Sequence, residues 1–289
     1  APNKQWKSTN QGSLIYMRHV SDPNDLSGEA SMDKIISWML SNLVMANQTC
    51  QILLPLMNII TTVGEIKDWF DKTQPTSDLN NHLTTFFENH GDDDYVSVEF
   101  KELFYPTWYL SNLFDKEDKW NATHWKEIIF QVITGYALIK SYYPTFSHFQ
   151  FRPDLTLVSL DPNSRPLVKF CHFDKVQIGG KPSRDLWYFF NILIDKYNFL
   201  ERNNVDDETK AVAKYCLDNK EADPLDILEY FKSTFKSLNA LDCNFIEGKA
   251  DNTNKGIQII AKKDSIEKAT TKKESTKKES TKKESTKKE

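Results

Sequence analysis

Three short runs in the first hundred residues are rich in β-branched and aromatic side chains. In one of them, 95–100, apolar and polar positions also alternate, as they do in a strand with one buried face. We therefore expect strands at 13–20, 52–63 and 95–100. The polar stretches 73–82 and 88–94 lie between the second and third strands and predict solvated loops.

Apolar residues at helical spacing mark most of the remaining chain. They predict amphipathic helices over 31–44, 121–144, 206–218 and 223–235. Asn121 is a good N-cap for the second of these helices, and Asp223 followed by Pro224 is a typical start for the last. The run 183–194 is apolar on nearly every side, which predicts a helix that is buried all round.

A β-hairpin is expected between the two central helices. Two apolar runs, 155–160 and 167–171, flank Asp161-Pro162-Asn163-Ser164, whose proline and Asx residues favour a turn. The order of elements is therefore a long helix, a loop, a hairpin, a second loop and a buried helix.

That order resembles the catalytic centre of the protein kinase superfamily, where a catalytic loop and an Asp-Phe-Gly loop flank such a hairpin. The pattern is similar to that of the serine/threonine kinase-like proteins of large nucleo-cytoplasmic DNA viruses. Aligned on it without a gap, His148 matches the motif histidine, Gln150 falls at the catalytic aspartate and Leu155 at the metal-binding asparagine. The positions of the Asp-Phe-Gly loop are taken by His172, Phe173 and Asp174.

These replacements remove the side chains that carry catalysis in the protein kinases that the chain resembles. In such kinases the first aspartate orients the substrate hydroxyl, while the asparagine and the second aspartate hold magnesium. The amide of Gln150 is a very weak base, and Leu155 offers no oxygen. The imidazole of His172 is a poor magnesium ligand, because magnesium prefers hard oxygen donors. The resemblance thus implies a pseudokinase, with no catalytic residues, cofactor or metal.

Two further positions take roles from the resemblance. Arg18 stands where the nucleotide-binding lysine would be, with Glu29 or Asp33 as its expected partner, and no G-x-G-x-x-G segment precedes it. Asp185 is the expected structural anchor, because its family role is to accept backbone hydrogen bonds from the catalytic loop. An alternative use of Asp154 and Asp174 in a displaced active site stays open.

The fold class expected from this resemblance is α+β, a two-lobed protein-kinase-like fold. Residues 1–100 would form a reduced small lobe and residues 101–247 a mainly helical large lobe. Residues 248–289 contain the repeat T-K-K-E-S, which has no apolar face to bury and predicts a disordered tail.

Composition and charge narrow the function classes. The chain has 289 residues, is 39% hydrophobic and carries a net charge of −4, with the lysine-rich tail opposing an acidic body. The body is therefore not expected to bind polyanions in general, although the tail could make weak contacts with nucleic acid or an acidic surface. The four cysteines are widely spaced and no apolar run is long enough to span a membrane, so an intracellular protein is expected.

We therefore expect a catalytically inactive kinase-like protein that acts as a binding, scaffold or virion structural module. Its partners would be proteins, such as capsid or virion proteins or another kinase, in the virion or the host cytoplasm. The alternative is an atypical nucleotide-dependent phosphotransferase with a rearranged active site, that is, a divergent serine/threonine kinase.

Overall fold

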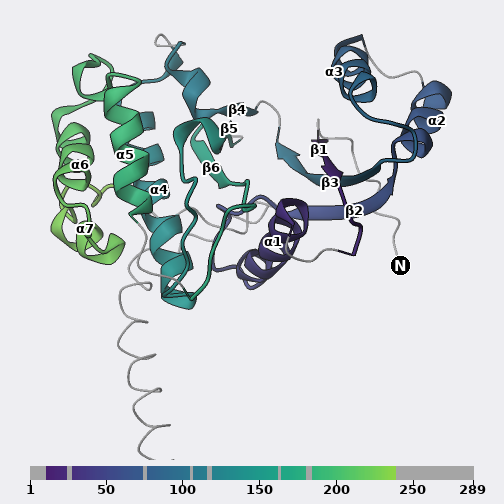
Figure 1. The fold of residues 1–289 in the computed structure, drawn as a ribbon. Coiled ribbons are helices and arrows are strands. Elements are labelled where there is room, and N and C mark those ends of the chain that lie inside the picture. Colours follow the sequence, from purple (N-terminus) through teal and green to yellow (C-terminus); the bar gives the residue numbers. More distant parts are fainter. Residues whose placement is uncertain are drawn as a thin grey trace, which may run out of the picture.

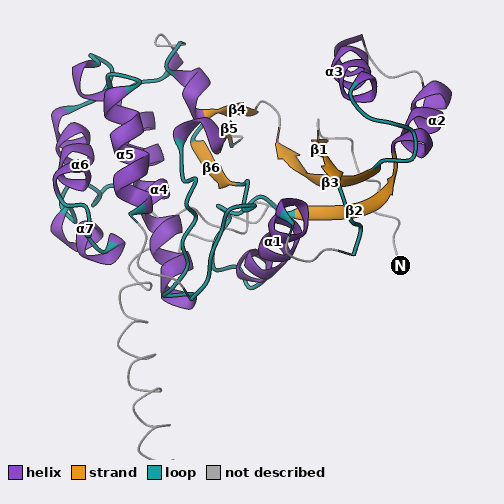
Figure 2. Cartoon of the chain, viewed as in Figure 1, coloured by secondary structure: helices purple, strands orange, loops and turns teal. Residues whose placement is uncertain are grey.

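A computed structural model describes residues 11–24, 28–73, 77–104, 107–115, 119–161, 164–179 and 184–238 of the chain. Within these ranges the protein is a mixed α+β structure with two three-stranded antiparallel sheets and helices α1 to α7 (Figures 1 and 2). The predicted tail, 248–289, lies outside the described residues.

The first sheet has the strand order β1-β3-β2. Its strands are β1 (Gln11–Val20), β2 (Pro55–Thr62) and β3 (Tyr95–Phe104), which confirms the three strands expected from the sequence. Arg18 on β1 faces Ser97 on β3, and Asn58 on β2 faces Glu99. Helix α1 (Glu29–Met45), also predicted, contacts β2 and lies beside this sheet (Figure 1).

Helices α2 (Val63–Thr73) and α3 (Ser77–Glu88) connect β2 to β3. The prediction of a loop over 73–82 is therefore wrong at Thr73 and from Ser77 onward. The predicted loop 88–94 is confirmed except at Glu88, the last residue of α3. The helices pack on the sheet through an apolar cluster in which Ile66 and Phe86 contact buried Val96 and Val98. This packing against the sheet explains why a largely polar segment is helical.

The second sheet has the order β4-β5-β6. The predicted hairpin is confirmed as β5 (Thr156–Leu160) and β6 (Pro166–Phe170), with β4 (Thr107–Tyr109) added along β5. At the turn, the Asp161 carboxylate accepts a 2.8 Å hydrogen bond from the backbone N–H of Arg165.

Four helices in this part of the chain were predicted and are present: α4 (Ala122–Tyr142), α5 (Asp185–Asp195), α6 (Asp207–Asp218) and α7 (Pro224–Tyr230), the last of which ends before the predicted end at 235. The short 3₁₀ helices η1 (Leu110–Leu113), η3 (Pro153–Leu155) and η4 (Phe199–Glu201) lie between them. The carboxamide of Asn121 caps α4 by accepting a hydrogen bond from the His124 backbone. Helix α5 is not buried all round as predicted, because Tyr188 on its outer side is 37% exposed.

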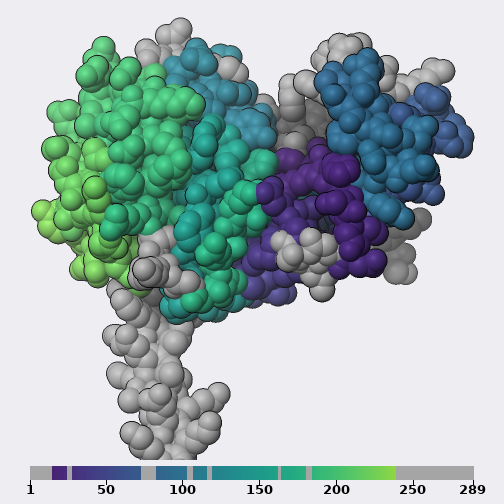
Figure 3. All heavy atoms as spheres, in the orientation of Figure 1, coloured from purple at the N-terminus to yellow at the C-terminus, as the bar shows by residue number. Residues whose placement is uncertain are grey.

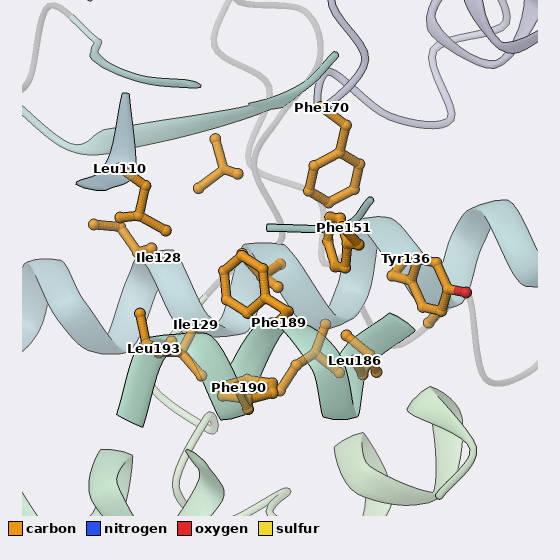
Figure 4. Packing of buried hydrophobic residues seen from close by; sticks show 14 of the residues in the cluster. Leu110, Ile128, Ile129, Tyr136, Phe151, Phe170, Leu186, Phe189, Phe190 and Leu193 are labelled. Carbon is orange, nitrogen blue, oxygen red and sulfur yellow. The ribbon is translucent and has the colours of Figure 1, made fainter. Parts of the chain in front are cut away.

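The main hydrophobic core lies between α4, α5 and the second sheet (Figure 4). Aromatic rings from the loop before the hairpin, from β6 and from α5 meet there: Phe151 is 5.1 Å from Phe170 and 5.0 Å from Phe189, centroid to centroid. Gly135 lets α4 approach this sheet closely, because a Cβ at that position would lie 2.8 Å from the Phe170 ring. Packing thus fixes the loop before the hairpin against β6 and α5.

In space, the first sheet with α1 to α3 lies on one side of the second sheet and α4 to α7 on the other (Figure 1). The space-filling view shows the purple and blue N-terminal elements as a mass beside the larger green helical part (Figure 3). Strand β3 runs through position 100 to Phe104. A division between residues 100 and 101, as expected from the sequence, would therefore cut a strand.

Candidate functional site

The two loops that flank the hairpin pack against each other and against the first sheet. Ser147 and Gln177 exchange backbone hydrogen bonds of 2.9 Å, which joins the loop before β5 to the loop after β6. The His148 ring lies 5.3 Å from the Phe173 ring, and its Nε2 lies 3.3 Å from the Cys171 carbonyl oxygen. The sequence positions 148 and 173 are therefore brought together.

His148 is buried, and burial lowers the pKa of its imidazole. A neutral ring with one nitrogen on a carbonyl oxygen is the form that this environment favours at neutral pH. Its Nδ1 has no hydrogen-bond partner among the described residues. These contacts fit a packed structural side chain better than a group that exchanges protons with a substrate.

Asp185, the first residue of α5, holds the loop at 148–149 through hydrogen bonds to its carboxylate. Its two carboxylate oxygens accept hydrogen bonds from the backbone N–H groups of His148, at 2.7 Å, and Phe149, at 3.0 Å. The hydroxyl of Tyr136 on α4 donates a third hydrogen bond of 2.6 Å. These are contacts of the kind that the resemblance implied for Asp185. They hold Phe149 in a left-handed backbone conformation with φ of 58°, which is uncommon for a bulky residue.

The side chains of Gln150 and Leu155 supply no group that could act as a general base. Gln150 is half-buried, and the backbone carbonyl of Leu155 accepts a hydrogen bond of 3.1 Å from the Cys171 thiol. The nearby carboxylate of Asp154 is paired with the guanidinium of Arg152, whose Nε lies 2.8 Å from it. The structure thus brings residues 155 and 171 together without forming an acid–base pair.

His172 lies between the loop after β6 and the first sheet. Its backbone is also left-handed, with φ of 62°, and its ring nitrogen lies 3.4 Å from the Tyr16 hydroxyl on β1. Burial lowers the pKa of the imidazole to about 4, so the ring is neutral at pH 7. Tyr109 on β4 stacks on its other side, with ring centroids 6.4 Å apart. Two tyrosines therefore enclose the side chain at the position of the metal-binding aspartate.

A buried charge cluster connects this loop to the first sheet. Asp33 on α1 is 0% exposed, and its Oδ2 accepts hydrogen bonds from Arg18 at 2.8 Å and Lys101 at 3.1 Å. Its Oδ1 accepts the backbone N–H of Phe173 at 2.9 Å. Of the two partners expected for Arg18, Asp33 provides the ion pair, while Glu29 contributes its backbone carbonyl at 3.4 Å.

The protonation states in this cluster follow from its contacts. Burial opposes the charge of Asp33, but Lys101, Arg18 and the Phe173 N–H outweigh burial and hold the pKa of the carboxyl below its usual value. Burial raises the pKa of Glu99, although its Oε2 lies 3.1 Å from Lys101 Nζ, whose charge acts in the opposite direction. Burial also raises the pKa of the Cys171 thiol to about 12, which keeps it protonated. No strong nucleophile results at pH 7.

Lys101 and Glu99 were missed by the sequence interpretation. The signal was present, because positions 97, 99 and 101 of a strand point to one face and here carry serine, glutamate and lysine. This polar face points toward α1, whereas Val98 and Phe100 on the opposite face pack with α2 and α3. The opposite charges of Glu99 and Lys101 on one face of a strand would have suggested an ion pair, and the position of α1 over this face makes that pair a buried one.

The carboxylate of Asp174, in the loop after β6, is also paired with a cation. Its Oδ1 lies 3.9 Å from Arg18, so the guanidinium bridges Asp33 and Asp174. Among the described residues, no group of three or more His, Cys, Asp or Glu side chains is placed to hold a metal ion. In the same part of the chain, no helix is long and apolar enough to cross a membrane.

Comparison with known proteins finds similarity over part of the chain. No protein family model matches the chain. An uncharacterized protein of Acanthamoeba polyphaga mimivirus is 28% identical over 147 residues, which cover 49% of this chain and 16% of the mimivirus protein. The match thus spans a small part of that relative's length. The chain is similar to a protein of a large DNA virus.

Proposed function

We propose that the chain is a catalytically inactive, kinase-like protein that acts as a binding or scaffold module. The order of elements supports this proposal: a small antiparallel sheet with a helix beside it, then a long helix, a loop, a hairpin, a second loop and a central helix. In a kinase-like frame, Asp33 on α1 pairs with Arg18 where the resemblance implies an ion pair between strand and helix. Asp185 holds the loop before the hairpin in the same way that the family pattern implies.

One observation carries the inactive assignment. The two loops are held in place by buried carboxylates, yet the side chains at the three chemical positions are an amide, an aliphatic chain and a neutral imidazole. Since an amide cannot accept the substrate proton and neither Leu155 nor His172 is a hard oxygen ligand, positioning alone would have to supply all catalysis.

The alternative, an atypical nucleotide-dependent phosphotransferase, requires carboxylates that are free to act. Asp154 is paired with Arg152, and Asp174 lies against Arg18, which is itself held by Asp33. A metal ion at either carboxylate would lie close to an arginine of the same sign of charge. This repulsion favours the inactive assignment over the alternative.

A binding role is supported by the apolar outer face of the first sheet. A groove of about 390 Å³ lies between the sheet and helices α2 and α3. Several of its side chains are unusually exposed for apolar residues, among them Met57 at 45%, Ile59 at 41% and Trp69 at 51%. Contiguous exposed apolar surface of this kind is typical of protein interaction sites. Capsid or virion proteins, or another kinase, are the proposed partners, in a virion or in the host cytoplasm.

The test combines nucleotide binding with phosphate transfer. The full chain is mixed with Mg-ATP and Mn-ATP in a thermal-shift assay, and with γ-labelled ATP and acceptor proteins in a transfer assay. We expect no shift in Tm and no labelled product. Transfer that disappears in Asp174→Asn or Asp154→Asn, but persists in the exposed control Asp218→Asn, would establish the alternative instead.

A second experiment tests whether a protein partner binds in the apolar groove. The wild-type chain and Trp69→Ser are each used to isolate complexes from cells that produce the protein, and Met45→Ser, another strongly exposed apolar position (76%), is the control. A defined partner should be retained by the wild type and the control and lost with Trp69→Ser. Equal retention by all three would remove the groove from the proposal.

A further inference from the structure

Strand β2 forms one edge of the first sheet. Among the described residues, β2 pairs with β3 and with no other strand. On the outer side of such an edge strand, alternate residues point their backbone N–H and C=O groups away from the sheet. A strand from another chain can pair with this row, so the edge favours a partner in extended conformation.

Apolar side chains of β2 are exposed on both faces of the sheet. Ile60 lies opposite Ser97, on the face toward α1, and is 36% exposed. Met57 and Ile59 lie on the other face, toward α2 and α3, and are also exposed. Exposure on both faces indicates that the flank of the strand is uncovered, and an uncovered apolar edge is a typical site for pairing with another chain.

The features that usually protect a sheet edge are confined to the start of β2. Pro55 and a shift of register between Pro55 and Met57 interrupt the ladder there, whereas 57–62 pair with β3 without interruption. No charged residue occurs in 55–62, while β1 at the opposite edge of the sheet carries Arg18. The stretch 57–62 can therefore receive a neighbouring strand without burying a charge of its own.

We propose that β2 pairs antiparallel with β2 of a second copy of this chain, so that the two first sheets join into one continuous sheet. A second copy fits because the uncharged edge places no like charges opposite each other, and because each copy supplies a strand of the same length and apolar character. A two-fold axis perpendicular to the sheet keeps equivalent faces on the same side. Within 57–62, such an axis pairs the most residues when it passes Ile59 or Ile60, which then lies opposite the same isoleucine of the other copy.

This pairing does not depend on the kinase-like assignment, because it uses no residue of the two loops that flank the hairpin. It is also separable from the apolar groove. Met57 and Ile59 line the groove, but Ile60 does not. A substitution at Ile60 therefore tests the pairing and leaves the groove lining unchanged.

Sedimentation equilibrium of the full chain over a range of concentrations measures the pairing. We expect the average mass to rise from 33.6 kDa, the mass of one chain, toward that of two chains. Ile60→Lys should raise the dissociation constant of the dimer at least about tenfold, because it brings two like charges to the contact. The control is Ile178→Lys, the same change at an exposed position (47%) in the loop after β6, and it should dimerise like the wild type. A wild type that remains a single chain, or equal dissociation constants for the two variants, would overturn the proposal.

Cysteine crosslinking tests the geometry without adding a charge to the strand. Ile59→Cys, Ile60→Cys and the control Ile178→Cys are each introduced together with Cys243→Ser, since the other three cysteines are buried. Directly opposite residues of antiparallel strands have Cα atoms about 4.5–5.5 Å apart, which is within the range of a disulfide. Under mild oxidation, Ile59→Cys or Ile60→Cys should form a covalent dimer faster than Ile178→Cys. Crosslinking at both strand positions that is no faster than in the control would contradict antiparallel pairing through β2.

Discussion

The carboxylate of Asp33 accepts a hydrogen bond of 2.9 Å from the backbone N–H of Phe173, which lies 140 residues further along the chain. The same side chain holds Lys101 on β3 and Arg18 on β1. One buried acid therefore connects α1, two strands of the first sheet and the loop after the hairpin. Its role in stability can be measured apart from any activity.

Asp33→Asn should be strongly destabilising. The substitution keeps the shape of the side chain but removes one of the two carboxylates beside Lys101, which is 0% exposed; the other, Glu99, lies 3.1 Å from the ammonium group. Breaking a buried ion pair by removing one partner costs roughly 3–5 kcal/mol, and because Glu99 still faces the lysine the free energy of unfolding should fall by up to about that amount in urea denaturation. In the double variant with Lys101→Met, the loss should be smaller than the sum of the two single losses, because the two side chains interact directly.

The matched control is Asp92→Asn. Asp92 pairs with Lys67 on the surface, where its side chain is 70% exposed. A surface ion pair contributes about 0–1 kcal/mol, so this variant should unfold almost like the wild type. Similar losses from Asp33→Asn and Asp92→Asn would mean that the cluster at Asp33 is hydrated rather than buried.

Asp185→Asn should loosen the loop before the hairpin. An amide has one acceptor oxygen in place of two, so the N–H groups of His148 and Phe149 cannot both keep their hydrogen bonds. We expect a loss of roughly 2–4 kcal/mol in the free energy of unfolding, because these bonds go to a buried charge. Amide hydrogen exchange at 148 and 149 should accelerate more than exchange within α4.

Tyr136→Phe is the control for that prediction. It removes one donor to Asp185 but leaves both backbone hydrogen bonds in place. The cost should be about 1 kcal/mol, and exchange at 148 and 149 should change little. Faster exchange at these two amides in Tyr136→Phe than in Asp185→Asn would show that the hydroxyl, and not the carboxylate, holds the loop.

The periodicity of the sequence was sufficient for most of the elements but not for their termini or for the helices on the outer face. The hairpin and the long helix after Asn121 could be predicted because their patterns reflect burial on one sheet or helix face. Helix α3 could not, because its first residues are polar and its stability comes from Phe86 and its neighbours packing on the sheet. Tertiary contacts of this kind leave little trace in a local pattern.

The contacts of the candidate site could also be predicted only in part from the sequence. The resemblance narrowed the partner of Arg18 to Glu29 or Asp33, and the structure selects Asp33. Lys101 escaped prediction because the predicted strand ended at residue 100 and a lysine is usually solvated. Only the arrangement of α1 over the sheet shows that its ammonium group is enclosed between Asp33 and Glu99.

Gly135→Ala should destabilise the protein although alanine is the better helix former. A Cβ at this position would lie 2.8 Å from both the Gln51 side chain and the Phe170 ring. Relieving such overlap in a packed core costs typically about 1–3 kcal/mol, which exceeds the gain of up to about 1 kcal/mol in helix propensity. Thermal and urea unfolding of Gly135→Ala should show the net loss.

Gly91→Ala is the comparison, because the nearest atom to its Cβ would be 3.8 Å away, on the Asp94 carboxylate. Its stability should stay within about 0.5 kcal/mol of the wild type. If Gly135→Ala were equally neutral, α4 would have to lie further from the second sheet than in this structure.

The enclosed imidazole of His172 should make stability depend on pH. Its pKa is lowered from 6.5 to about 4 by burial. Between these pKa values the unfolded chain binds one more proton than the folded chain, so the free energy of unfolding rises with pH. The contribution of the neutral His172 ring to stability is therefore complete above about pH 6.5 and is lost as the pH falls to 4. A shift of this size corresponds to about 3 kcal/mol at most.

His172→Asn isolates that contribution. Asparagine cannot be protonated in this range and tolerates the left-handed backbone at position 172, where φ is 62°. The variant and the wild type share all other titrating groups, so the difference between their unfolding free energies should change by up to about 3 kcal/mol in favour of the variant from pH 7 to pH 4. An NMR titration of the ring should give a midpoint near 4 in the folded protein. A midpoint near the ordinary value of 6.5 would mean that Tyr16 and Tyr109 leave the ring in water, and that the loop is open at the position where the resemblance places a metal ligand.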